Sequence, residues 1–304
     1  MTCRPVQMLA VFAALALLLP ACKGEEKKQP EKKTEAKTPE PAPAPTPPEP
    51  RFDLSGPKPP ETSSVVFAVD GALLPLACWD KKQGKILPGK DCVALVAAGS
   101  EVYMESSFGT KALEKTSAGT KNSMCGDKGA IPTPELDKGA AYDWAVWPKS
   151  LAPEFAQMHP DTRSDRGARL EDAETKAVVA AITKIRNIKG DFRPKQNATV
   201  DIDGDGKDEL FVSAILVNPS DPDTYLFSGL FMAPGGDLEN LVLIDRSKES
   251  ADVITLRGVV DLDGDGRREL WTTLTFDGGS GDRIVQWTDD GEPEPVSGWS
   301  CGAG

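Results

Sequence analysis

The sequence predicts a mainly β protein of the α+β class that contains one amphipathic helix. Short runs of β-branched and aromatic residues recur from residue 63 onward, and only one segment has clear helical periodicity. The decapeptide DIDGDGKDEL at residues 201–210 returns as DLDGDGRREL at residues 261–270, which indicates two units of one β architecture. We therefore expect a small disulfide-linked β unit at residues 63–150, followed by a β-repeat domain with two aspartate-rich loops at residues 151–304.

Residues 1–21 have the features of an export signal. A positive charge at Arg4 precedes an apolar run of residues 8–19, which is shorter than the ~20 residues needed to span a bilayer. The run ends in LPAC, and this tetrapeptide resembles the lipobox of bacterial lipoproteins. The resemblance implies cleavage before Cys22 and modification of this cysteine with diacylglycerol and a fatty acid such as palmitate. The alternative is an ordinary secreted protein that is cleaved near Ala21.

Lipidation of Cys22 would decide where the protein resides. Two or more acyl chains hold a protein stably on a membrane, because each buried methylene contributes ~0.8 kcal/mol. Lys23 follows the cysteine, whereas an aspartate at this position of a bacterial lipoprotein resembles a signal for retention at the inner membrane. We therefore expect a lipid-anchored protein of the cell envelope, at the outer membrane if the organism is Gram-negative.

Residues 22–62 predict a disordered tether between the lipid anchor and the folded part. Beyond the cysteine they hold eleven of the 26 prolines, eight basic and eight acidic side chains, and too few large apolar residues to fold. The whole chain carries −12, the signal +1 and the tether 0, so residues 63–304 carry −13. Such an acidic surface disfavours nucleic-acid binding and favours divalent cations.

The cysteines predict disulfides. Beyond the signal and Cys22 the chain has four of them, an even number that allows two disulfides with three possible pairings in an oxidising compartment. We favour Cys78–Cys92, because glycines and a proline between them can turn the chain; such a loop is worth ~3 kcal/mol. Cys125–Cys301 follows by elimination. A zinc site of four thiolates is the alternative, but the sequence has no C-x2-C pair.

Residues 63–150 predict a β unit with little helix. The runs at residues 63–71 and 92–106 combine β-branched and aromatic residues and predict strands, with a turn at residues 98–100. The stretch at residues 124–141 is rich in glycine and proline and predicts a loop.

The one clear helix is predicted at residues 171–189. Acidic residues gather at its start and basic residues near its end, which suits the helix dipole, and Gly190 stands where a helix stop is expected. Val178, Ile182 and Ile185 fall on one face, so we expect this face to cover a sheet. Strand-like runs follow at residues 197–217, 224–232, 240–246, 254–276 and 282–287.

Each aspartate repeat matches the first nine positions of a calcium loop. Carboxylates stand at positions one, three, five and nine, and the backbone carbonyl of position seven completes an oxygen-rich set that suits a hard cation. Glycines at positions four and six permit the positive φ values that aim these groups at one point. The candidate ligands are Asp201, Asp203, Asp205, Lys207 and Glu209 in the first loop, and Asp261, Asp263, Asp265, Arg267 and Glu269 in the second.

These loops do not match an EF-hand. Position twelve is Val212 or Thr272, where an EF-hand has a bidentate glutamate, and strand-like residues flank both loops. Residues 199–287 instead resemble the D-x-D-x-D-G-x-x-D calcium loops of FG-GAP and VCBS repeats, found in integrin-like β-propellers and bacterial surface proteins. The resemblance implies about two structural Ca²⁺ ions, with glutamate in place of aspartate at position nine. Two repeats do not support a closed propeller of four or more blades. A solvated acidic turn without metal is the alternative.

No catalytic constellation is visible in the sequence. His159 is the only histidine, no G-x-S-x-G motif accompanies it, and tryptophans such as Trp144 and Trp147 suit core packing better than sugar stacking. We therefore expect a non-enzymatic, membrane-anchored lipoprotein with a binding, adhesion or structural role in the envelope. Its ligand would be a glycan or a protein, and not a nucleic acid. The alternative is an envelope-anchored hydrolase that acts on polysaccharide.

Overall fold

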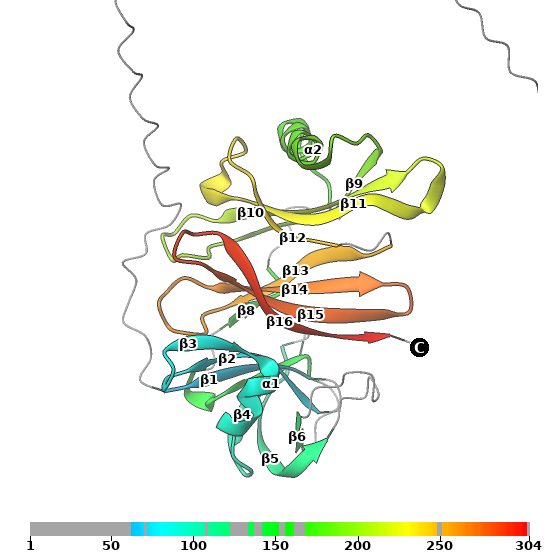
Figure 1. Ribbon diagram of the computed structural model, residues 1–304. Helices are drawn as coiled ribbons and strands as arrows, with labels where there is room; N and C mark the ends of the chain where they lie inside the picture. Colours follow the sequence, from blue (N-terminus) through cyan, green and yellow to red (C-terminus); the bar gives the residue numbers. More distant parts are fainter. Residues whose placement is uncertain are drawn as a thin grey trace, which may run out of the picture. The chain divides into compact units, whose positions relative to one another are not determined.

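The folded part of the chain is mainly β, as the sequence predicts, and consists of three antiparallel sheets and two α-helices (Figure 1). All described residues belong to the compact unit Pro48–Gly304. None of their helices is long and apolar enough to cross a membrane. The computed structural model describes residues 62–69, 72–106, 109–121, 133–136, 142–151, 156–160, 168–247 and 251–302.

Some predictions fall on other parts of the chain. The predicted signal and tether, Cys22 and Cys125 lie outside the described residues. Lipidation of Cys22 and the pairing of Cys125 with Cys301 therefore stay predictions, although Cys301 lies on a described strand.

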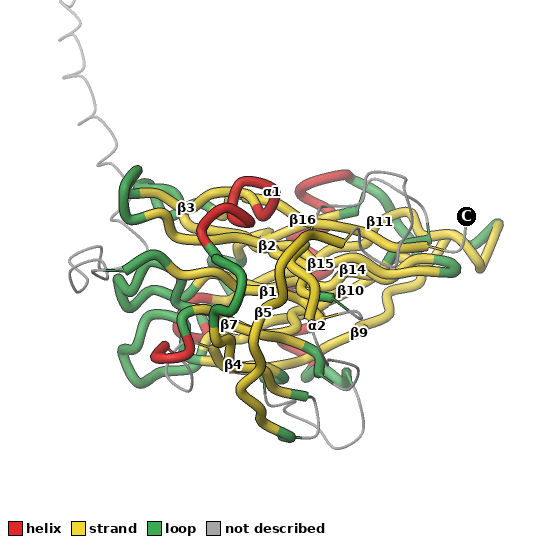
Figure 2. Tube along the Cα trace, turned by 90° about the horizontal axis from the view of Figure 1, so that it is seen from below, coloured by secondary structure: helices red, strands yellow, loops and turns green. Residues whose placement is uncertain are grey.

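The N-terminal sheet has seven strands in the order β3-β2-β1-β7-β4-β5-β6. The predicted disulfide between Cys78 and Cys92 is present and joins β2 to the short helix α1 (Gly89–Cys92) across a Cα–Cα distance of 5.7 Å. Figure 2 shows α1 beside β2 and β3. The strands are β1 (Ser64–Val69), β2 (Leu73–Asp80), β3 (Lys85–Pro88), β4 (Glu101–Glu105), β5 (Lys111–Lys121), β6 (Thr133–Leu136) and β7 (Trp144–Trp147).

Two segments of this sheet differ from the prediction. Residues 92–97 were expected to be a strand, but α1 and the 3₁₀ turn η1 (Val93–Leu95) occupy most of this segment. The disulfide holds Cys92 against β2, and a Cβ at Gly89 would lie only 1.8 Å from the carbonyl oxygen of Pro75, so the chain turns tightly here. The expected loop at residues 124–141 contains β6, whereas the turn at residues 98–100 is present, with Ser100 N–H donating to the Ala97 carbonyl at 3.1 Å.

The other two sheets each carry one aspartate loop between neighbouring antiparallel strands. The first loop joins β9 to β10, where Glu209 pairs with Val200; the second joins β13 to β14, where Glu269 pairs with Val260. The loops therefore stand at the same register position of two strand pairs. The four-stranded order is β12-β11-β10-β9, the five-stranded order is β16-β15-β14-β13-β8, and the three sheets do not close into a propeller.

Strands β9 to β15 correspond to the predicted runs, whereas β8 and the final strand β16 were not predicted. A short 3₁₀ turn, η2 (Lys149–Leu151), precedes them, and a second, η3 (Pro234–Gly236), follows β11. The strands are β8 (Ala156–Met158), β9 (Asp191–Val200), β10 (Glu209–Asn218), β11 (Asp221–Ala233), β12 (Val242–Arg246), β13 (Val253–Val260), β14 (Glu269–Phe276), β15 (Gly279–Trp287) and β16 (Pro293–Gly302).

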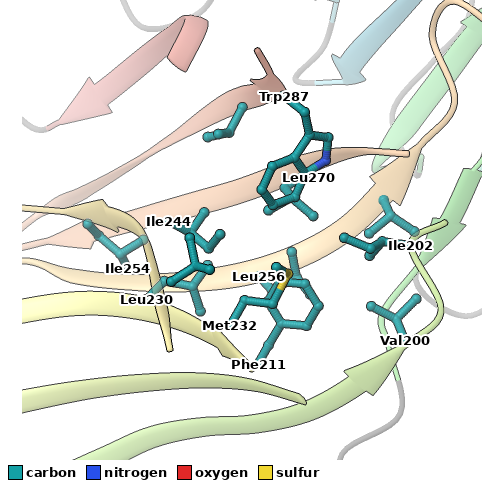
Figure 3. Packing of buried hydrophobic residues seen from close by; sticks show 13 residues of the cluster. Val200, Ile202, Phe211, Leu230, Met232, Ile244, Ile254, Leu256, Leu270 and Trp287 are labelled. Carbon is teal, nitrogen blue, oxygen red and sulfur yellow. The ribbon is translucent and has the colours of Figure 1, made fainter. Parts of the chain in front are cut away.

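The four-stranded and five-stranded sheets pack face to face over a shared hydrophobic core (Figure 3). Phe211 of the first sheet and Leu256 of the second are both buried in this core. Ile202, at position two of the first loop, also belongs to it and is fully buried. Gln196 of β9 also links the two sheets by hydrogen bonds. Its side-chain amide donates to the Leu256 carbonyl and accepts from the Leu256 N–H, both at 2.7 Å.

A second core joins the five-stranded sheet to the seven-stranded sheet. It contains Val66, Trp144 and Trp271 together with Leu262, which is position two of the second loop and is fully buried. Trp144 therefore packs in the core, in line with the more common use of tryptophan. Each loop thus inserts its second residue into the interface with the next sheet, which anchors the loop to the layered core.

Helix α2 (Asp172–Arg186) covers the outer face of the four-stranded sheet, as predicted (Figure 1). Val178 and Ile182 are fully buried, but Ile185, in the last turn, is 38% exposed and does not complete the predicted face. The helix ends at Asn187, which adopts a left-handed conformation with φ 46°. Gly190 is therefore not the stop: a Cβ there would lie 2.8 Å from the Val217 carbonyl oxygen, so the close approach to β10 requires glycine.

Candidate metal centre

Both loops use their position-nine glutamate to close the turn. A carboxylate oxygen of Glu209 accepts the N–H of Ile202 at 2.8 Å, and a carboxylate oxygen of Glu269 accepts the N–H of Leu262 at the same distance. Because Ile202 and Leu262 are buried, each loop is held both by a hydrophobic anchor and by a hydrogen bond across its neck. The two glutamates therefore lie under the loops rather than in solvent.

The first loop gathers three of its predicted ligands. Asp201, Asp203 and Glu209 offer carboxylate oxygens that lie within 4.8 Å of one another. Asp201 also shapes the turn, because its two oxygens accept the N–H groups of Gly204 at 2.7 Å and Gly206 at 3.0 Å. Both glycines have positive φ, 75° and 82°, as the loop pattern predicts.

Asp205 does not join this cluster. Its carboxylate accepts the Lys207 backbone N–H at 2.7 Å and contacts the Lys207 ammonium at 3.1 Å. These hydrogen bonds with Lys207 lower the pKa of Asp205, so the carboxylate is neutralised by the lysine. The geometry thus turns position five of the first loop away from the other ligands.

The second loop gathers a different set of three. Asp261, Asp263 and Asp265 offer oxygens within 4.8 Å of one another. Among the described residues, no donor meets the buried Oδ1 of Asp261 in hydrogen-bond geometry, although the backbone N–H groups of Gly264 and Gly266 lie close enough to lower the pKa of this carboxyl. A buried carboxylate oxygen without a donor is costly, so a cation would be favourable at this position.

Burial and mutual repulsion raise the pKa values of these carboxyls. Burial raises the pKa of Glu209 to about 7, with a smaller contribution from the charges of Asp203 and Asp201. Burial likewise raises the pKa of Asp263 to about 7, and the charge of Asp265 adds to this effect. Glu269 is fully buried, and its pKa lies well above the usual value for the same reason. Such groups favour a bound cation or a proton over the bare charge.

A polar pocket of about 350 Å³ opens onto the second loop. Asp263, Arg267 and Glu269 line it from the loop, Trp79 and Lys85 from the N-terminal sheet, and Trp287 and Glu294 from β15 and β16. Residues 204–208 of the first loop are exposed. The position-seven carbonyls of Lys207 and Arg267 stay predicted ligands.

The only histidine is not part of this centre. His159 follows β8 with a left-handed φ of 56°, and its backbone N–H donates to the Arg257 carbonyl at 2.8 Å. It lines a separate pocket of about 420 Å³ together with Gln196, Arg257 and Thr273. None of the described residues hydrogen bonds to its imidazole.

Sequence reasoning missed the residues that brace the loops. Ser64 donates to the Leu262 carbonyl at 2.6 Å, the indole of Trp287 donates to the Arg268 carbonyl at 3.0 Å, and Gly235 N–H donates to Glu209 at 3.3 Å. These partners come from other strands and turns, so no local pattern predicts them. The sequence contained one sign that the loops are held differently: position eight of the nine-residue pattern is Asp208 in the first loop and Arg268 in the second.

Comparison of the chain with protein-family models, with curated proteins and with solved structures gives no match. What the loops bind is therefore inferred from their own geometry and charge.

Proposed function

We propose that the chain is a non-enzymatic lipoprotein of the cell envelope whose two aspartate loops bind structural Ca²⁺. Cys22 would anchor it, residues 23–62 would act as the tether, and the β domain would serve in binding, adhesion or envelope structure. The observation that carries the metal assignment is the pair of carboxylate clusters at equivalent register positions, with the Asp261 oxygen buried and unpartnered within the described residues.

The donor chemistry favours calcium over other metals. All side-chain donors in the clusters are carboxylates, and no described histidine or cysteine takes part. Such all-oxygen sets suit hard cations, and Ca²⁺ accepts six to eight oxygens in flexible loops, whereas Mg²⁺ demands stricter octahedral geometry. Backbone carbonyls and water would complete the coordination shell. The ion would therefore be structural, because protein oxygens fill most of its positions.

The expected stabilisation is modest. Extracellular calcium modules bind with dissociation constants of ~10⁻⁴–10⁻³ M. At millimolar calcium this corresponds to ~0.4–1.4 kcal/mol for each site. That is enough to order a loop but too little to fold the domain, so the layered core must form without the ions.

Calcium titration tests the metal assignment. Isothermal titration of the purified chain should show about two sites, and terbium luminescence should report the same number. Asp201→Asn and Asp261→Asn should each weaken one site at least tenfold, because each removes a charged ligand at position one. Asp208→Asn is the matched control, since it removes an equal charge from an exposed, non-ligand position of the first loop. No uptake at millimolar calcium would overturn the assignment.

Metabolic labelling with palmitate tests whether Cys22 is lipidated and anchors the protein to the cell envelope. The wild-type chain should carry label and fractionate with membranes, and Cys22→Ala should lose both properties. Cys3→Ala is the control, because this cysteine lies in the predicted signal and should leave labelling intact. A soluble, unlabelled wild-type chain would contradict the lipoprotein assignment.

A glycan array together with a hydrolase screen tests the non-enzymatic role. Binding without turnover would support a binding or adhesion protein. Polysaccharide turnover that a single carboxylate substitution outside both loops abolishes would instead establish the hydrolase.

A further inference from the structure

The two loops touch each other although they belong to different sheets. The backbone N–H of Arg268 donates to the Ile202 carbonyl at 2.8 Å, and its guanidinium donates to the Asp201 carbonyl at 3.1 Å. A Cβ at Gly204 would lie 4.0 Å from the carbonyl oxygen of Gly266, so the two glycine turns also approach each other. Position eight of the second loop therefore holds positions one and two of the first.

The backbone of a single residue, Ile202, links the two carboxylate clusters. The Ile202 N–H donates to Glu209 of the first loop, while its carbonyl accepts from Arg268 of the second. Arg268 is followed directly by Glu269, whose carboxylate holds the Leu262 N–H. Ile202 and Arg268 therefore form a continuous hydrogen-bonded connection between the two loops.

Arg268 also acts on the charge of its own loop. Burial and then the Asp265 charge raise the pKa of Asp261. The backbone N–H groups of Gly264 and Gly266 oppose this rise, and the positive charge of Arg268 adds a smaller opposing effect. Its guanidinium further contacts the Gln157 side chain at 3.2 Å, which fixes it against β8. The arginine thus stands beside position one of both loops and is held in place by a third element.

We propose that Arg268 is a positioning residue that couples the two loops, so that calcium binding at one increases the calcium affinity of the other. This inference rests on the proposed calcium-binding function. An ion in the second loop would order the peptide between positions seven and nine, which carries Arg268. The ordered Arg268 would then hold Asp201 in place, so a second ion meets a loop that has already lost part of its freedom.

Repulsion between the ions does not oppose this coupling strongly. The first loop has five acidic residues and one lysine, a charge of −4, and the second has four acidic residues and two arginines, a charge of −2. With one Ca²⁺ each, the loops carry −2 and 0, so neither becomes positive. We therefore expect the shared ordering of the loops to set the sign of the coupling.

Calorimetric titration of the full chain with calcium chloride measures the coupling. The variants D201N/D203N and D261N/D263N each leave one site and yield its association constant alone. The product of the two wild-type association constants should exceed the product of these single-site constants by on the order of fivefold, the lower end of common coupling strengths. By linkage, either ion then raises the affinity of the other loop by this factor.

Substitution of Arg268 tests whether this residue carries the coupling between the two loops. The same set of measurements in an R268A background should show an excess of about twofold or less, since the backbone contact to Ile202 survives. R268K is the second variant, because it keeps the charge and loses the guanidinium geometry. R193A is the matched control: it removes an exposed arginine at the far end of β9 and should keep the fivefold excess.

The outcomes separate this inference from the function on which it rests. If the product of the two wild-type association constants equals the product of the single-site constants, the coupling is overturned and two independent calcium sites remain. An excess that persists in both R268A and R268K would overturn the role of Arg268. Absence of calcium binding by the wild-type chain would instead overturn the proposed function itself.

Discussion

The two aspartate loops share a nine-residue pattern and a register position, but their surroundings differ. The first loop is largely exposed, and Lys207 draws one of its carboxylates away from the cluster. The second loop is half-buried beside the N-terminal sheet, and Ser64 and Trp287 brace it from other strands. The same local sequence thus places three carboxylates together in both loops, but they come from positions one, three and nine in the first loop and from positions one, three and five in the second. Packing around a loop selects which of its oxygens converge.

The pKa values of the carboxyls also differ between the two loops. Glu209 and Glu269 are both buried, and burial raises the pKa of both, to about 7 for Glu209 and well above the usual value for Glu269. Burial raises the pKa of both position-three aspartates, Asp203 and Asp263, and that of Asp263 reaches about 7, whereas hydrogen bonds with Lys207 lower the pKa of Asp205 in the first loop. The second loop therefore has more to gain from a bound cation, and the comparison can be tested.

The hydrophobic anchors should show the largest effect. Ile202→Ala and Leu262→Ala should each lower the free energy of unfolding by about 3 kcal/mol, because each removes a fully buried side chain from an interface between sheets. Urea unfolding measures both values. Ile185→Ala, on the exposed end of α2, is the control and should cost less than ~1 kcal/mol. A cost below that of the control for either anchor would show that its loop is not held by the core.

The stabilisation by calcium should depend on pH. Burial raises the pKa values of Glu209 and Asp263 to about 7, so the metal-free protein loses stability as the pH rises through this range. Calcium binds the ionised carboxylates and offsets the loss, so the increase in Tm with millimolar calcium should be larger at about pH 8 than at about pH 5. The difference corresponds to about 1 kcal/mol for each site.

This pH dependence also distinguishes the loops. It should be steeper in D201N/D203N, where the second loop is intact, than in D261N/D263N. The pKa is raised for three carboxyls of the second loop and for two of the first: Asp261, Asp263 and Glu269 against Asp203 and Glu209. Equal slopes in the two variants would contradict the electrostatic difference between the loops.

The hydrogen bond that Ser64 of the N-terminal sheet donates to the second loop should contribute about 1 kcal/mol to the free energy of unfolding. Ser64→Ala removes the buried hydrogen bond to the Leu262 carbonyl and should lower the free energy of unfolding by this amount. It should also weaken calcium binding in the second loop and leave the first unchanged, as measured by titration of the single-site variants. Equal weakening of both sites would mean that Ser64 acts on the whole domain.

The lysine of the first loop should show the smallest effect on stability. Lys207→Ala breaks an exposed ion pair and should change the free energy of unfolding by less than ~0.5 kcal/mol. Since Asp205 then loses its cation, calcium affinity of the first loop should increase about twofold. A decrease in affinity would show that the lysine side chain supports the site.

Much of the fold could be predicted because it depends on local patterns. The α2 helix, the Cys78–Cys92 disulfide and the two loops each follow from residues within about twenty positions of one another. Strands such as β10 are short, nearly continuous apolar runs, which their length and β-branched or aromatic residues identify. The strands β2, β3, β5, β6, β7, β8 and β16 were missed, because they are short or because turn residues or polar residues interrupt their apolar pattern.

The sequence alone determined the type of loop, the positions of its carboxylates and the glycines that allow it to turn, because these depend on backbone geometry over nine residues. Only the tertiary structure decided which carboxylates converge, how deeply they are buried and which distant residues hold them. Arg268 and Asp201 are separated by 67 positions, and Ser64 and Leu262 by 198. Such contacts depend on how three sheets stack, and that stacking follows from the summed burial of many apolar side chains rather than from any one motif.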